Sequence, residues 1–219
     1  MSVKARARKL WTSEGLQGLL SGMARFARGQ MRNLYYRADF LIHEFDLSSL
    51  PVEYQFAVPD EVEVQVVESD ADASRLAGAG YEDFRQVVPL SDYRLRSGAV
   101  GFCAYIERNV VHTSWIGLSD RAKRSFDFVP YVVDFDHGEG ASGGTWTFPA
   151  YRGRGIFRYV MWHRLWYLRE HGRTVSRDST EVGNVPAIRG QEVFPSRITG
   201  TLHITRVLGH TRSSYEESH

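Results

Sequence analysis

The sequence predicts an α+β protein, with a mixed β-sheet that carries helices on both faces. Residues 99–108 and 110–116 are two apolar runs separated by a short polar turn, which is typical of an antiparallel hairpin. Residues 142–148 resemble a strand, and a glycine loop joins them to an amphipathic helix that ends near Gly172. Strands that pair first as hairpins and then around a crossover helix give this class of fold.

The other elements of the sheet follow from shorter patterns. Residues 61–66 alternate between polar and apolar side chains, which indicates a half-buried first strand, and Ser69 or Asp70 is suited to cap the short helix after it. A second helical or loop segment extends to Gly98. Further strands are expected at residues 131–135, 174–180 and 198–207.

The chain is expected to have four parts. Its 219 residues are many for one average domain and few for two, so one domain with an appendage is the natural expectation. We assign residues 1–38 to a basic amphipathic helical arm, 39–59 to an irregular or strand-containing connector, 60–210 to the main domain, and 211–219 to a polar, frayed C-terminal tail.

Composition and cysteine content exclude several classes of protein. With 42% hydrophobic and 24% charged residues, the chain has the composition of an ordinary globular protein rather than a disordered one. The single cysteine, Cys103, excludes an internal disulfide framework and a cysteine-based zinc site, and its apolar neighbours predict a buried strand position. No uncharged apolar stretch approaches the ~20 residues of a membrane span, and a secretory leader is poorly supported. We therefore expect a cytoplasmic protein.

The arm is the most basic part of the chain. Residues 1–38 carry eight Lys or Arg against one Glu, a net charge of +7 in a chain of net charge +1. Apolar residues recur at helical spacing from Leu16 to Tyr35, and four glycines share one flank, which favours close approach of a neighbouring helix or chain. Several alternatives stay open: an arm that is partly unfolded, packing on its own domain, a partner helix or homodimer contact, and peripheral binding to the anionic inner face of a membrane. Nucleic acid is disfavoured, because the basic residues lack interleaved aromatics.

The loop before the central helix has the properties of an anion-binding site. It reads Arg152-Gly153-Arg154-Gly155, and Ile156 begins the helical pattern. Glycines in front of a helix leave N–H groups without intrahelical partners, and these amides, together with the positive end of the helix dipole, bind phosphate. The loop lacks the third glycine of a dinucleotide fingerprint and the Gly-Lys-Ser/Thr of a P-loop. A solvent-exposed basic turn is the alternative interpretation.

These residues resemble the acyl-CoA-binding motif of the GNAT superfamily of N-acetyltransferases, Arg/Gln-x-x-Gly-x-Gly/Ala. Arg152 and Gly155 fit the motif, whereas Phe157 replaces its final small residue. A second stretch, from Asn184 to Ala187, resembles the family's Asn-x-x-Ala/Ser motif, which begins the last helix.

The resemblance implies a GNAT-like fold and acetyl-CoA, or another acyl-CoA, as acyl donor, with no metal. It assigns cofactor binding to the strand before the loop, to the loop itself and to the second motif. The implied residues are Thr145, Trp146, Thr147, Arg152, Gly153, Arg154, Gly155, Ile156, Phe157, Asn184 and Ala187. In the family the strand before the loop lends backbone groups to the pantetheine arm, and parting of the next strand opens a slot for it.

An N-acyltransferase needs a group that removes a proton from the acceptor amine. The titratable residues near the predicted cleft are Asp134, Asp136, His137 and Glu139, and Glu139 is our first choice as catalytic base; Asn184 lies on the cofactor side of the same catalytic cleft. An exposed turn is the structural alternative for the segment, and a metal site formed by the same cluster is disfavoured. Where the family often has a tyrosine that protonates the leaving thiolate, this chain has Gln191.

The sequence thus predicts transfer of an acetyl or other acyl group to a primary amine of a small molecule, such as an amino sugar or an envelope precursor. One alternative is a long-chain N-acyl amino acid synthase that uses acyl-CoA or an acyl carrier protein. Another is a catalytically silent module that binds acyl-CoA or a partner.

Overall fold

The computed structural model describes residues 35–57 and 61–218, so the arm up to residue 34 lies outside the described residues. The chain divides into two compact units. Within the described residues the larger unit comprises residues 40–202 and 216–218, and the smaller unit comprises residues 35–39 and 203–215.

The larger unit is built on a mixed sheet with the strand order β2-β3-β4-β5-β6-β1-β7. The β5–β6 pair is parallel, and β2–β3, β3–β4, β4–β5 and β1–β6 are antiparallel. The strands span Tyr35–Asp46 (β1), Glu63–Val67 (β2), Val100–Ile106 (β3), Asn109–Gly117 (β4), Glu139–Thr147 (β5), Val175–Glu181 (β6) and Ser196–Val207 (β7). In the smaller unit, the end of β7 pairs with β8, His210–Glu217.

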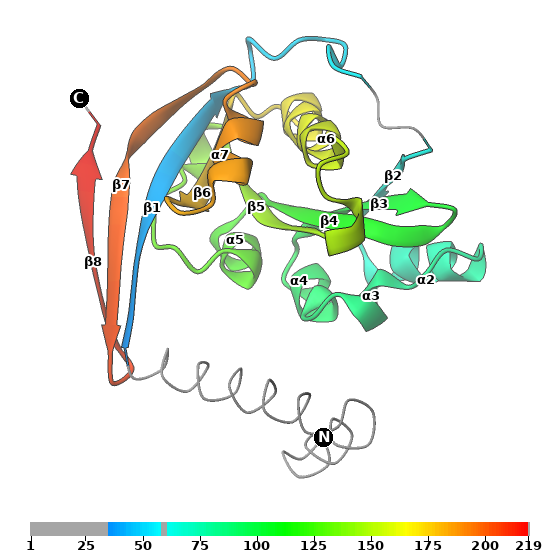
Figure 1. The fold of residues 1–219 in the computed structure, drawn as a ribbon, viewed down its shortest axis with the longest axis horizontal. Helices are drawn as coiled ribbons and strands as arrows, with labels where there is room; N and C mark the ends of the chain where they lie inside the picture. Colours follow the sequence, from blue (N-terminus) through cyan, green and yellow to red (C-terminus); the bar gives the residue numbers. More distant parts are fainter. Residues whose placement is uncertain (1–34, 58–60, 219) are drawn as a thin grey trace. The chain divides into compact units, whose positions relative to one another are not determined.

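Helices cover both faces of the sheet in the larger unit. Figure 1 shows α6 over one face and the run from α2 to α5 beneath the other. The helices span Asp70–Gly78 (α2), Phe84–Val87 (α3), Ser91–Arg96 (α4), Asp120–Phe126 (α5), Ile156–Glu170 (α6) and Val185–Gln191 (α7), with short 3-10 turns at Phe135–His137 and Pro149–Tyr151. This arrangement confirms the predicted α+β class.

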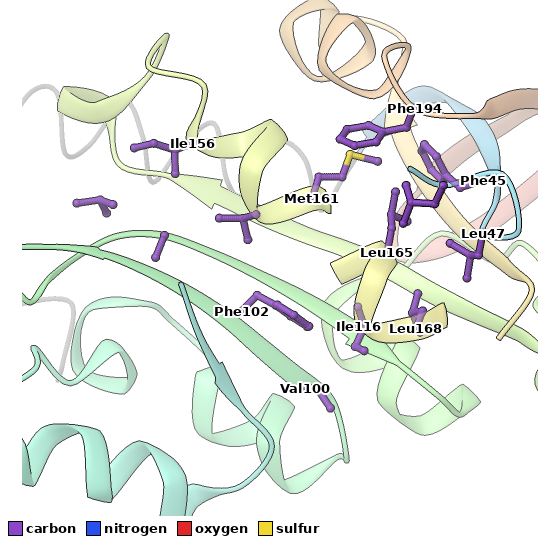
Figure 2. Close-up of a cluster of buried hydrophobic side chains, with 14 residues drawn as sticks. Phe45, Leu47, Val100, Phe102, Ile116, Ile156, Met161, Leu165, Leu168 and Phe194 are labelled. Atoms are coloured by element: carbon purple, nitrogen blue, oxygen red, sulfur yellow. The ribbon is translucent and has the colours of Figure 1, made fainter. Parts of the chain in front are cut away.

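The core has two layers because strand side chains alternate between the two faces. On β3, Val100 and Phe102 pack toward α6, whereas Cys103 and Tyr105 pack in the layer formed with α2 to α5. Figure 2 shows Ile156, Met161, Leu165 and Leu168 of α6 directed at the sheet, with Phe102 and Ile116 opposite. The apolar stripe of this helix therefore fixes it across the central strands.

Most predicted elements lie where the sequence indicates. The hairpin is β3–β4, the Ser69 hydroxyl accepts a hydrogen bond from the backbone N–H of Asp72 and caps α2, and Gly172, with φ of 73°, follows the end of α6.

The predicted strand at residues 131–135 is wrong. Tyr131 and Val133 are buried while Val132 is 84% exposed, which imitates the alternation of a strand. The segment pairs with no neighbouring strand, and the Asp134 carboxylate accepts the backbone N–H of His137, which favours the 3-10 turn.

The expected strand-containing connector includes most of β1, whereas the expected polar tail forms the strand β8. Residues 40–46 of β1 pair with β6, from Phe40 opposite Glu181 to Asp46 opposite Val175, so they lie inside the sheet. Residues 210–217 form β8, and every residue of this strand is exposed. A fully exposed strand carries no apolar alternation, which is why its sequence resembles a polar tail.

Candidate active site

The parallel strands β5 and β6 part after three paired positions. Glu139, Gly140 and Ala141 pair with Val175, Ser176 and Arg177, and the pairing stops there although both strands continue. Beyond that point β5 remains paired with β4, and β6 remains paired with β1. The facing edges of residues 142–147 and 178–181 therefore lack strand partners, and the sheet is open between them.

A bulge in β5 lies at the start of this gap. Thr113 of β4 is opposite Trp146 and Trp115 is opposite Gly143, so β5 has one extra residue there. Gly144 has φ of 58°, and a Cβ on it would lie 2.9 Å from Cβ of Phe126 and 3.0 Å from Cδ1 of Trp115. Only glycine fits this backbone and this space, so the bulge is built into the sequence.

The glycine loop follows β5 and leads into α6. Gly153 and Gly155 have φ of 77° and 80°, and no side chain caps the helix at Gly155. A Cβ on Gly153 would meet nothing within 4 Å. The first amides of this 15-residue helix have no side-chain cap and lie at the positive end of the helix dipole.

The two arginines of the loop lie beside it. Nε of Arg152 donates to the carbonyl of Thr147 at 3.1 Å, and its guanidinium lies 5.2 Å from the ring of Trp146, which is 49% exposed. Arg154 lies 5.8 Å from the ring of Tyr151. The structure thus brings Thr147, Trp146 and Arg152 together at the end of β5.

The second motif begins α7, the helix that follows β6. Asn184 is the exposed N-cap residue of α7, and its side chain makes no capping hydrogen bond. Ala187 is half-buried one turn further on. Asn184 directly follows β6, and its backbone N–H donates to the carbonyl of Glu181, the last residue of that strand, at 2.8 Å.

Phe157, the departure from the family motif, packs directly on α7. A Cβ on Gly190 would lie 2.6 Å from Cε1 and 2.7 Å from Cδ1 of Phe157. The large side chain is accommodated because the opposing residue has no side chain. Ile156 is buried in the core, so its predicted cofactor role can involve only its backbone.

A buried polar cluster lies in the gap between β5 and β6. Asp178 of β6 is 4% exposed and Arg164 of α6 is 1% exposed, with Nη2 of the arginine 4.0 Å from the aspartate Oδ2. The Ser142 hydroxyl donates to the same carboxylate at 3.4 Å and accepts from Ser176 at 3.1 Å. Burial raises the pKa of Asp178 to about 7, against the opposing effect of the Arg164 charge.

Gln191, where the family often has a tyrosine, is part of this cluster. It is 2% exposed, and its Oε1 accepts from the Thr180 hydroxyl at 2.9 Å. Its side chain also hydrogen-bonds the Asp178 carboxylate. The amide therefore holds a buried carboxylate in place and offers no titratable proton.

Glu139 lies at the closed end of β5, outside the gap. Its carboxylate accepts from Nε and Nη2 of Arg177, both at 2.7 Å, and from the backbone N–H of Asp134 at 2.8 Å. The hydrogen bonds from Arg177 hold the pKa of Glu139 below its usual range. A carboxylate held in this way is a weak base, so the geometry favours a structural role over the predicted catalytic one.

The other acidic residues of the segment are also placed away from the gap. Asp134 pairs with Nδ1 of His137 at 2.8 Å, on the exposed 3-10 turn. Within residues 35–57 and 61–218, no three His, Cys, Asp or Glu side chains are arranged to hold a metal ion.

His112 of β4 lies near the loop side of the gap. Its Nδ1 is 2.7 Å from the Thr147 hydroxyl, its Nε2 is buried without a partner, and its ring lies 6.5 Å from that of Phe157. Burial first, and the Arg164 charge second, lower the pKa of His112 to about 3. The imidazole is therefore neutral near pH 7.

Sequence reasoning missed Asp178, Arg164 and His112. One signal was available: Arg164 interrupts the apolar stripe of α6, between Met161 and Leu168, and a cation at such a position needs a buried partner. Nothing in the sequence identifies that partner, because it comes from another element.

Three comparisons with known proteins bear on the fold. No protein-family model and no curated protein matches the chain. An acetyltransferase of the GNAT family from Colwellia psychrerythraea is 14% identical with a TM-score of 0.50, over 84% of this chain and 57% of its own. A GCN5-related N-acetyltransferase from Sphaerobacter thermophilus is 12% identical with a TM-score of 0.51, over 88% and 57%.

A GCN5-related glucosamine N-acetyltransferase region of a fungal multi-domain β-N-acetylglucosaminidase is 14% identical with a TM-score of 0.55. That match covers 88% of this chain and 23% of the fungal protein. The chain therefore spans little more than half the length of the first two structures and less than a quarter of the third. The strand order, the parted parallel pair and these neighbours lead to one conclusion: the chain has the fold of the GNAT acetyltransferases.

Proposed function

We propose that the protein is an N-acyltransferase that moves an acyl group from acyl-CoA to a primary amine. The observation that carries the proposal is the opening between β5 and β6 beside a glycine loop and an uncapped helix N-terminus. A thioester donor presents a pyrophosphate, an extended amide-bearing arm and an acyl group. These three parts match the three features of the site in kind and in order.

The residues of this chain fit such a donor. The loop amides from Gly153 to Phe157 would bind the pyrophosphate, with Arg152 and Arg154 adding positive charge beside it. The unpaired edge of β5 at residues 145–147 would bind the arm through backbone groups, as a short strand would. Asn184 and Ala187 would border the arm on the α7 side. When bound, the donor supplies an acyl carbon open to attack by an amine.

The acceptor is a small molecule with a primary amine, and we propose an amino sugar as the first class to test. The fungal neighbour is described as a glucosamine N-acetyltransferase region, and glucosamine is therefore the first amine in the panel. A long-chain acyl donor remains the second candidate.

The first experiment measures thermal unfolding with free CoA, acetyl-CoA and palmitoyl-CoA. A ligand that binds only the folded state stabilises it by RT ln(1 + [L]/Kd), about 2.7 kcal/mol at a hundredfold excess over Kd. We expect this stabilisation with free CoA and acetyl-CoA. No shift with any of the three compounds would refute acyl-CoA binding, and a larger shift with palmitoyl-CoA would favour the long-chain alternative.

Two glycine variants locate the binding site. Gly153 and Gly172 have φ of 77° and 73°, and a Cβ on either would meet nothing within 4 Å. Gly153→Ala and Gly172→Ala therefore carry the same backbone strain at opposite ends of α6. We expect both to lower the melting temperature equally without ligand, and only Gly153→Ala to reduce the acetyl-CoA shift. Equal shifts in both variants would place the ligand elsewhere.

A further inference from the structure

We propose that Asp178 is the general base of the acyl transfer and that Arg164 is its positioning residue. The proposal rests on the proposed function. It differs from the sequence prediction, which gives this role to Glu139.

The first argument is the position of Asp178 in the gap. The side chains of Ser176, Asp178 and Thr180 are directed toward α6 and α7 by strand alternation, and Arg164 and Gln191 contact Asp178 from that side. The charge of Asp127, which follows α5 on the other face, raises the pKa of Asp178, and Asp178 in turn raises the pKa of the Tyr131 hydroxyl. Charged groups from both faces of the sheet therefore surround Asp178 where β5 and β6 have parted.

This position suits the chemistry. The glycine loop is on the α6 side of the sheet, so an acyl group that passes along β5 would arrive at residues 142–144. The carboxylate of Asp178 lies 3.7 Å from where a Cβ on Gly143 would stand. An amine that reaches residues 142–144 would therefore meet the acyl carbon beside this carboxylate.

The second argument is the incomplete pairing of Asp178. The structural pair Glu139–Arg177 is closed by two hydrogen bonds of 2.7 Å. Arg164 is instead 4.0 Å from Asp178, its Nη1 donates to the carbonyl of Gly143 at 3.3 Å, and its Nε is buried without a partner. A buried ion pair without a direct hydrogen bond lowers the stability of the folded state. Such a pair at the centre of a candidate site therefore indicates a functional requirement.

The protonation states of the groups around Asp178 are consistent with its role as a base. Arg164 favours the ionised carboxylate, and burial together with Asp127 opposes it. His43 of β1, opposite Asp178 in the register, is buried and its pKa is lowered to about 4, so it is neutral near pH 7. Tyr131 is neutral as well, because burial raises the pKa of its hydroxyl. Asp178 is thus the group in the gap that changes its protonation near neutral pH.

The reaction balances with this one carboxyl group. The amine nitrogen forms a bond to the acyl carbon, the carbon–sulfur bond breaks, and its electron pair leaves with sulfur. The proton lost by nitrogen passes to Asp178 and from there to the thiolate, so the carboxylate is ionised again at the end. The same group therefore serves as base and acid, and the missing tyrosine at Gln191 is not needed.

The test compares Asp178→Asn with Asp127→Asn, a matched control because Asp127 is also a buried aspartate, 7% exposed, hydrogen-bonded to Ser179. Rates are measured by thiol release from acetyl-CoA with glucosamine and a panel of simple primary amines, and acetyl-CoA affinity is measured by calorimetry. We expect Asp178→Asn to lower kcat by about 10²- to 10⁴-fold with unchanged affinity. Asp127→Asn should keep the maximal rate and shift the rising limb of the pH profile to lower pH, since its charge raises the pKa of Asp178.

A measurement without catalysis supports the same inference. In wild-type protein labelled with ¹³C at aspartate carboxyl groups, one resonance should titrate near pH 7 and be absent from Asp178→Asn. If Asp178→Asn does not fold, the displaced pH profile of Asp127→Asn still decides the matter. Acetyl-CoA binding without turnover of any amine, or a rate in Asp178→Asn within threefold of wild type, would overturn the assignment. Absence of acetyl-CoA binding by the wild type would instead overturn the proposed function.

Discussion

Glu139, the first paired residue of β5, and Arg177, the last paired residue of β6, form a two-point ion pair with both hydrogen bonds at 2.7 Å. Arg177 also binds Glu44 of β1 at 2.9 Å, so one guanidinium ties three neighbouring strands together. This contact spans the short segment over which the two parallel strands pair. It holds the two strands together at one end while they are apart at the other.

The first prediction is that Glu139→Gln destabilises the fold more than it slows acyl transfer. Charge-assisted hydrogen bonds contribute about 1.5 to 3 kcal/mol, and solvent screening of this half-buried pair reduces the expected loss to about 1 to 2 kcal/mol. Because the pKa of Glu139 is lowered in the folded state, its contribution is present above the unfolded value near 4.5 and disappears as the pH falls below it. Urea unfolding of wild type and variant at neutral pH and at about pH 3 measures both effects.

A large fall in kcat with unchanged stability would return Glu139 to the catalytic role. The control is Asp120→Asn, which removes an exposed ion pair with Arg124 on the surface of α5. That change should alter neither stability nor rate measurably.

The role predicted for Glu139 shows which features of this fold and site can be predicted from the sequence and which cannot. The glycine loop, the central helix and the hairpin were predictable because each depends on residues adjacent in the chain. The sequence favours Glu139 as the base because it lies at the start of the strand that leads into the loop, but Arg177, which neutralises it, belongs to β6. The pairing of β5 with β6 decides that Glu139 is held in a close ion pair and that Asp178 is not. That pairing joins residues far apart in the sequence.

The gap itself could be expected only from the family resemblance. No local pattern distinguishes Ala141, which pairs with β6, from Ser142, which pairs with β4 but not with β6. The strand predicted at residues 131–135 failed for the same reason, since alternation shows which side chains are buried and not whether the backbone has a partner.

The second prediction concerns the contact of Phe157 with Gly190. A Cβ on Gly190 would lie 2.6 Å from the Phe157 ring, so Gly190→Ala should destabilise the fold by about 1 to 3 kcal/mol despite the better helix propensity of alanine. Adding Phe157→Leu to Gly190→Ala should restore most of the lost stability, and a double-mutant cycle by urea unfolding measures the coupling free energy. Gly78→Ala in α2 is the control, since its Cβ would meet nothing within 4 Å. Additive effects of the Phe157 and Gly190 changes would show that the two side chains do not share this space.

The third prediction concerns acid sensitivity. Burial lowers the pKa of His112 to about 3, so the unfolded chain binds a proton near pH 6.5 and the folded one does not. Stability is therefore complete above pH 6.5 and falls by up to about 1.4 kcal/mol per pH unit below it. His112→Asn should reduce this slope between about pH 6 and 4, whatever its absolute stability.

A second buried histidine provides the comparison for that slope. His43 should act like His112, because burial lowers its pKa to about 4. An unchanged slope in His112→Asn would mean that the imidazole is hydrated or charged in solution.

The fourth prediction concerns the basic arm, of which residues 1–34 lie outside the described residues and residues 35–38 begin β1. Its net charge of +7 over residues 1–38 predicts salt-sensitive binding to vesicles that contain phosphatidylserine, with about 1 kcal/mol for each cation near the surface. A truncated chain that begins at Tyr35 keeps the whole of β1 and should lose this binding. Within the described residues, no helix is long and apolar enough to cross a membrane.

Equal sedimentation of the full chain with neutral and anionic vesicles would reject the membrane role. Poor solubility of the truncated chain would then point to an arm that covers an apolar surface of its own protein or of a partner. Sedimentation velocity of both forms would separate these two outcomes, because only a partner or homodimer contact changes the molecular mass.

The burial of Cys103 in β3 makes the protein its own reporter. It is the single cysteine of the sequence, it is 0% exposed, and burial raises the pKa of its thiol, so the folded chain should be silent toward thiol reagents. A colorimetric reagent that counts released CoA can therefore follow turnover continuously without a contribution from the enzyme. The same reagent, applied without substrate, would record each molecule that unfolds. In a Trp146→Cys variant, a thiol-reactive fluorophore would label the new cysteine alone, because Cys103 is buried.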